Sequence, residues 1–75
     1  MTTRKQVEAA LAKEAAKLNA AHTGVHRFGP IQRTLGAGCN WTATFQAIGS
    51  RLPLDELQDA LERVQRAFPH VDFKD

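Results

Sequence analysis

The sequence predicts an α+β fold of element order αββα, or αββαβ if the tail adds a strand. Apolar residues recur at helical spacing near both ends of the chain, whereas residues 40–47 alternate between apolar and polar. With 75 residues there is room for a single small α+β domain, residues 1–75. We expect a two-layer fold in which two helices pack on one face of a small antiparallel sheet.

Residues 3–21 are expected to form the first helix. They are rich in alanine, lysine and glutamate, and no glycine or proline interrupts them. Thr2 or Thr3 can serve as the N-cap, and Gly24 predicts the stop. The apolar stripe is narrow and consists of Val7, Ala10, Leu11, Ala15, Leu18 and Ala21.

Residues 25–35 and 40–47 are expected to form a β-hairpin around a turn at residues 36–38. Gly29-Pro30 interrupts the first strand, which predicts a kinked edge strand or two short pieces. In the second strand Cys39, Trp41, Ala43, Phe45 and Ala47 share an apolar face, opposite a polar, uncharged one. The apolar face is assigned to the core and the polar face to solvent or a partner.

A second helix is expected with Pro53 at its first helical position, and Pro69 ends it. Its apolar stripe is Leu54, Leu57, Leu61, Val64 and Phe68. The hairpin's Trp41 and Phe45 are expected to pack on this stripe. The tail, residues 71–74, can add a short third strand.

The composition narrows the class of protein. No apolar run reaches the roughly 18 residues of a membrane-spanning helix, and the start of the chain does not resemble a signal peptide. One cysteine excludes an internal disulfide and fits a reducing compartment. We therefore expect a cytoplasmic protein of a bacterium or a bacterial virus, with no membrane partner. A chain this short is marginally stable alone, and exposed sheet edges invite pairing, so we expect a homodimer.

The charge distribution raises one alternative. Residues 1–51 carry a net +5 and residues 52–75 a net −3. This asymmetry can mark two halves that attract each other, or a nucleic-acid face. The residues proposed for weak, salt-sensitive nucleic-acid binding are Lys13, Lys17, Arg27, Arg33 and Arg51, with no aromatic stacking platform beside them.

Three possible chemical motifs in the sequence do not meet the requirements of the chemistry they suggest. Gly36-Ala37-Gly38 lacks the third glycine of a dinucleotide fingerprint and leads into a strand. His22 and His26, with Cys39 and the remote His70, lack regular metal-ligand spacing because Gly24 breaks the register. A nucleophilic Cys39 would need one of these histidines beside it, and its apolar strand face favours a packing role.

The acidic residues Asp55, Glu56, Asp59 and Glu62 are typical of a solvated helix face. We therefore expect no catalytic residues, no metal and no cofactor. The prediction is a small non-enzymatic intracellular protein-interaction module that associates with itself. Nucleic-acid binding is the alternative.

Overall fold

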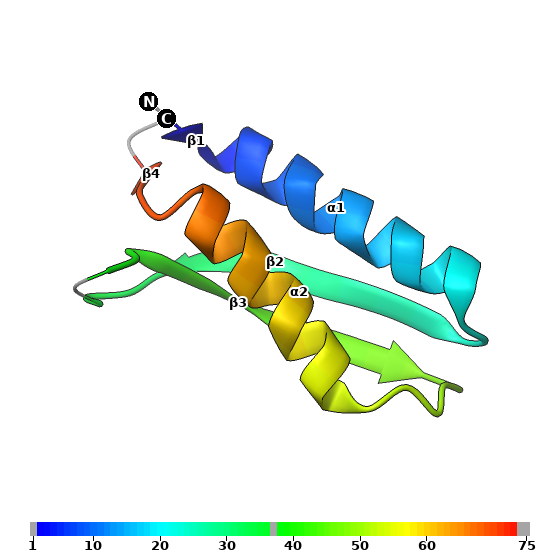
Figure 1. Cartoon of the computed structure of the whole chain (residues 1–75). Helices are drawn as coiled ribbons and strands as arrows, with labels where there is room; N and C mark the ends of the chain where they lie inside the picture. Colours follow the sequence, from blue (N-terminus) through cyan, green and yellow to red (C-terminus); the bar gives the residue numbers. More distant parts are fainter. Residues whose placement is uncertain (1, 37, 74–75) are drawn as a thin grey trace.

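The structure is a computed structural model that describes residues 2–36 and 38–73. Its elements, in chain order, are β1 (Thr2–Thr3), α1 (Arg4–Ala21), β2 (Val25–Arg33), β3 (Trp41–Ile48), α2 (Leu54–Ala67) and β4 (Val71–Asp72). The helices form one layer and the β2–β3 hairpin forms the other, with α1 against β2 and α2 against β3 (Figure 1). The α+β fold, with both helices on one face of an antiparallel hairpin, is confirmed.

Helix α1 begins with a capping box. The Thr3 hydroxyl accepts a hydrogen bond from the Gln6 backbone N–H at 3.3 Å, and the Gln6 side chain accepts one from the Thr3 N–H at 2.8 Å. Both bonds satisfy N–H groups that have no partner within a helix. The buried residues of α1 are Val7, Leu11 and Ala15. Ala21, expected in the same stripe, is exposed.

The hairpin contains a β-bulge where the sequence predicts a kink. Phe28 pairs with Phe45 and Ile31 pairs with Ala43, so β2 has one more residue than β3 between these pairs. A side chain at Gly29 would collide with the hydroxyl of Thr44. The extra residue keeps Phe28 and Ile31 on the same face of the sheet, because side chains alternate with a period of two.

The first strand is shorter than expected at its end. Residues 34 and 35 lie beyond β2, and Leu35 is 98% exposed. The Thr34 N–H still donates to the Asn40 carbonyl at 2.8 Å, so the hairpin remains closed at this point. Part of the predicted turn, Ala37, lies outside the described residues.

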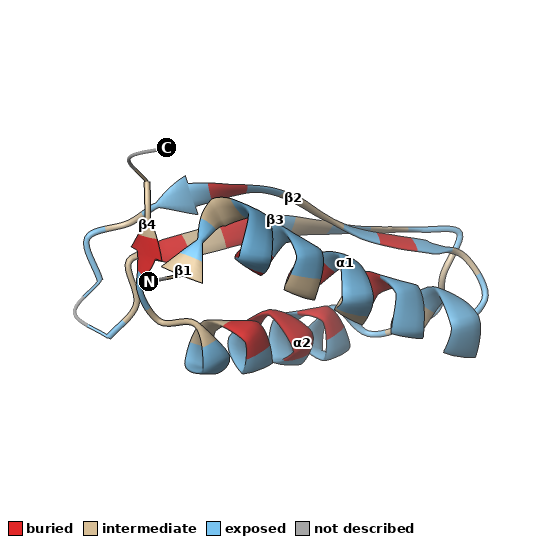
Figure 2. Ribbon diagram, turned by 90° about the horizontal axis from the view of Figure 1, so that it is seen from above, coloured by how far each residue is buried: buried red, intermediate tan, exposed pale blue. Residues whose placement is uncertain are grey.

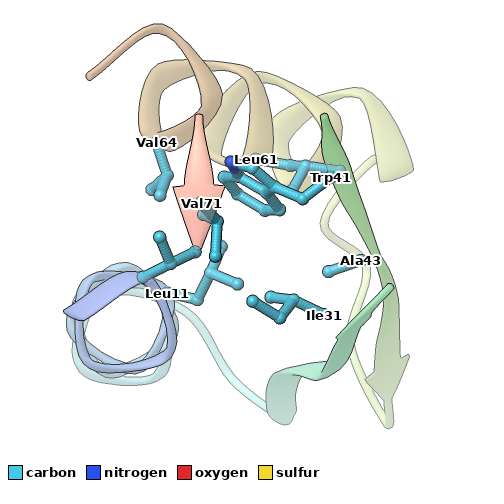
Figure 3. Packing of buried hydrophobic residues seen from close by; sticks show 8 residues of the cluster. Leu11, Ile31, Trp41, Ala43, Leu61, Val64 and Val71 are labelled. Atoms are coloured by element: carbon cyan, nitrogen blue, oxygen red, sulfur yellow. The ribbon is translucent and has the colours of Figure 1, made fainter. Parts of the chain in front are cut away.

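The core lies between the two layers, as the burial colours of Figure 2 show. Trp41 is 1% exposed and packs in one cluster with residues of both helices and both long strands (Figure 3). Its indole N–H donates to the Phe68 carbonyl at 2.6 Å, which ties β3 to the end of α2. The predicted core position of Trp41 is confirmed, and Phe45 is half-buried beside the cluster.

The tail forms a strand, although not with the hairpin. In β4, Val71 and Asp72 pair in parallel with Thr2 and Thr3 of β1. Val71 is 5% exposed and belongs to the core cluster. The pairing therefore joins the two ends of the described chain, while Lys74, included in the predicted tail strand, lies outside the described residues.

Helix α2 differs from the prediction at its first residue. Pro53 is the N-cap, with extended backbone, and the helix starts at Leu54. Asp55 and Glu56 occupy the first turn, where negative charge is favourable to the helix dipole. Neither helix, over the described residues, is long and apolar enough to cross a membrane.

Candidate functional site

The basic residues proposed for nucleic-acid binding are distributed over different surfaces. Arg27 pairs with Gln46 across the strands, on the face turned away from the helices, and its Nε donates to the Gln46 Oε1 at 3.2 Å. Arg33 ends β2 beside the hairpin loop, whereas Arg51 follows β3 at the opposite end. These three arginines therefore do not share one compact patch.

The two lysines belong to the other layer. Lys13 and Lys17 are exposed on α1 and line a hollow between the helices. In that hollow Arg63 of α2 forms an ion pair with Glu14 at 3.3 Å. The sheet separates these lysines from the face that carries Arg27, so the five residues do not share one surface. Nucleic-acid binding by all five together stays a prediction.

Cys39 lies at the opposite end of the hairpin from His22 and His26, and only His70 belongs to a segment beside it. Cys39 stands at the hairpin-loop end, and its Sγ donates to the Trp41 carbonyl at 3.3 Å. His22 and His26 are at the other end of the hairpin, with ring centroids 6.3 Å apart. Within residues 2–36 and 38–73 no group of three or more His, Cys, Asp and Glu residues is placed to hold a metal ion.

The outer edge of β2 is capped by a side chain at His26. His26 turns its backbone N–H and carbonyl away from β3, and the Asn19 side chain of α1 binds both, at 2.6 and 3.1 Å. The amide of Asn19 thus takes the place of a neighbouring strand. Further along β2, the bulge between Phe28 and Ile31 distorts the edge. Natural proteins use these devices to prevent edge pairing.

The outer edge of β3 is different. In an antiparallel strand the N–H and carbonyl of one residue point to the same side, and successive residues alternate. The Trp41 carbonyl points away from β2, because it accepts from the Gln65 side chain at 3.0 Å. By alternation, Ala43, Phe45 and Ala47 also turn their backbone groups outward. None of the six groups has a hydrogen-bond partner among the described residues.

Helix α2 borders this edge. Gln65 reaches the strand at Trp41, and one and two turns earlier the same side of α2 carries Glu62 and Gln58, whose side chains are joined by a 3.3 Å hydrogen bond. A hollow of about 530 Å³ continues the edge at the hairpin-loop end. Its lining residues are Gly38, Cys39, Glu62, Gln65, Arg66 and Pro69. The edge of β3 thus combines unpaired backbone groups with the carboxylate of Glu62, and the guanidinium of Arg66 lines the hollow at its end.

A buried histidine forms a second polar site at the other end of the hairpin. His26 is 1% exposed, yet both ring nitrogens are hydrogen-bonded. Nδ1 lies 2.9 Å from the Asn19 Oδ1, and Nε2 lies 2.7 Å from the Ser50 Oγ. The Asn19 oxygen can only accept, so Nδ1 carries the proton in the neutral ring and Nε2 accepts from the Ser50 hydroxyl.

The long-range contacts of the two asparagines, which are the only ones in the chain, were not predicted from the sequence. Asn19 binds both backbone groups of His26, and Asn40 binds both backbone groups of Val71, at 2.8 and 2.9 Å. The sequence holds only a weak signal for these two sets of contacts. An asparagine near the end of a helix or beside a turn usually satisfies its own neighbours, whereas these reach residues 7 and 31 positions away.

Comparison of the chain with protein-family models, with curated proteins and with solved structures finds no match.

Proposed function

We propose that this chain is a protein-interaction module that binds an extended segment of a partner protein along the free edge of β3. The observation that carries the proposal is the row of outward-facing backbone groups on Ala43, Phe45 and Ala47. An added strand would pair with three N–H donors and three carbonyl acceptors. Main-chain pairing of this kind supplies affinity with little dependence on sequence.

The contrast between the two edges supports this assignment. Asn19 occupies the edge of β2 at His26 and a bulge interrupts that strand, whereas β3 from Thr42 to Ile48 contains no proline, no charged residue and no bulge of its own. Proteins that stay monomeric usually protect an edge of this length. An unprotected edge of uncharged residues is consistent with a strand that pairs with an extended segment of another molecule.

The chemistry of the partner follows from the neighbouring helix. Glu62 is exposed on the side of α2 that borders the β3 edge. A basic side chain on the added strand would therefore meet a carboxylate, whereas an acidic one would be repelled. We assign the partner as an extended segment that carries lysine or arginine among β-forming residues.

The test is a titration of the full chain with the heptapeptide Lys-Val-Lys-Val-Lys-Val-Lys, followed by amide-resolved NMR. We expect shifts at Ala43, Phe45 and Ala47 and weaker binding at higher salt. The variant Ala47→Pro removes one outward donor and leaves the ladder to β2 intact. It should weaken binding about two- to tenfold, the equivalent of one hydrogen bond.

The contribution of the Glu62 carboxylate to peptide binding is tested by a matched pair of variants. Glu62→Gln should reduce the affinity for the peptide, while Glu8→Gln on exposed α1 should not. Shifts that avoid β3, or equal binding by the Ala47→Pro variant, would refute the proposal. Sedimentation of the free chain tests the predicted homodimer separately. A concentration-dependent dimer that Ala47→Pro abolishes would identify a second copy as the occupant of the edge.

A further inference from the structure

The cluster of Asn19, His26 and Ser50 has the geometry of an activated nucleophile. Ser50 Oγ is 2.7 Å from His26 Nε2, and His26 Nδ1 is 2.9 Å from Asn19 Oδ1. A hydroxyl in contact with a base that a third group orients is the arrangement found in nucleophilic catalysis. We propose that Ser50 is a nucleophile that accepts acyl groups from small esters, with His26 as its general base. This inference does not depend on the occupation of the β3 edge.

The proton arrangement favours attack by the Ser50 oxygen. The Leu52 N–H donates to Ser50 Oγ at 3.0 Å, so one lone pair of the hydroxyl is engaged. The hydroxyl proton points to His26 Nε2. In the tautomer fixed by Asn19, this nitrogen carries the lone pair of the ring. Each of these contacts orients the group before a substrate arrives, which is a requirement for efficient proton transfer.

The surroundings of Ser50 provide space and an anion-stabilising group. Ser50 is half-buried and lines an open hollow of about 470 Å³ together with His22, Arg51 and Leu52. The backbone N–H of Arg51, the residue after Ser50, has no hydrogen-bond partner among the described residues. The N–H after a nucleophilic serine can stabilise the negative charge on an attacked carbonyl oxygen.

These features define the substrate class. The Arg51 side chain is exposed at the hollow and would attract a negatively charged ester or thioester. In the first step a bond forms between Ser50 Oγ and the acyl carbon, and the hydroxyl proton moves to His26 Nε2. The bond from the acyl carbon to the leaving oxygen or sulfur then breaks, and the leaving group takes that proton. Water then attacks the acyl carbon, and its proton passes to His26 Nε2. The bond from the acyl carbon to Ser50 Oγ breaks, and Oγ takes that proton back.

The test exploits the composition of the chain, in which Ser50 is the only serine. The full chain is incubated with a fluorophosphonate probe, which phosphonylates activated serines with loss of fluoride, and is then digested and analysed by mass spectrometry. We expect one label on the peptide that contains Ser50 and none on the Ser50→Ala variant. The rate should exceed that of an acetyl-Gly-Ser-Arg-amide peptide at least about 100-fold, the usual effect of a general base.

A second set of variants separates chemistry from support of the fold. Asn19→Leu should slow labelling at least about tenfold, because the ring of His26 loses its orienting partner. Asn19→Asp retains an acceptor for Nδ1 and should restore the rate, which a purely structural role would not require. Gln32→Ala, at an exposed position of β2 outside this hollow, is the control and should label as the parent does. Labelling of the folded parent chain at the peptide's rate would overturn the proposal.

Discussion

Replacement of Asn40 by alanine should weaken the attachment of the tail of the chain to the hairpin. The Asn40 side chain donates to the Val71 carbonyl at 2.9 Å and accepts from the Val71 N–H at 2.8 Å. Each bond contributes about 0.5–1.5 kcal/mol, so the variant should lose about 1–3 kcal/mol of unfolding free energy. Domains have about 0.05–0.15 kcal/mol per residue in total, so this loss is a large fraction of the stability of so short a chain.

Urea denaturation followed by Trp41 fluorescence measures this loss. With a slope of about 1 kcal/mol per molar urea, typical of small proteins, the midpoint should fall by about 1–3 M. Asn40→Asp keeps the acceptor for Val71 and loses the donor, so it should also destabilise. Gln32→Ala, at an exposed position, is the control. A midpoint for Asn40→Ala within about 0.3 M of the parent would refute the assigned role.

Three further results are expected. Trp41→Ala should cost about 3–5 kcal/mol and leave the chain largely unfolded by circular dichroism, because the indole is 1% exposed in the core. Gly24→Ala should lower the thermal midpoint, because Gly24 has φ +107° and an added Cβ would lie 2.7 Å from the Ile48 carbonyl; an unchanged midpoint would contradict this geometry. Mixed oligonucleotides should shift the amide signals of Arg27, Arg33 and Arg51 at low salt if the nucleic-acid alternative holds, and shifts at one arginine alone would count against it.

The local pattern predicted most of the fold. Alternation in residues 40–47 placed Trp41 and Ala43 on the buried face, and Gly29-Pro30 predicted the irregularity that the structure shows as a bulge. These features depend on side-chain spacing within one strand. Such spacing is visible in a single sequence because the period of a strand is fixed by its backbone.

The long-range polar contacts could not be predicted in this way. The bonds from Asn19 to His26 and from Asn40 to Val71 depend on how two elements are placed in three dimensions. The same holds for Ser50, which contacts His26 because the segment after β3 lies beside the residues that follow α1. The sequence indicated that a strand edge would be exposed, and the contacts of Asn19 and Gln65 were needed to identify which edge that is.

Amide hydrogen exchange along β3 is the most direct measurement of the central claim. In the dilute free chain, the amides of Thr42 and Gln46, which face β2, should exchange slowly, while those of Phe45 and Ala47 should exchange fast. Addition of the lysine–valine heptapeptide should protect Phe45 and Ala47 and leave the others unchanged. Protection of Phe45 and Ala47 in the dilute free chain would show that the edge is already closed and would contradict the account.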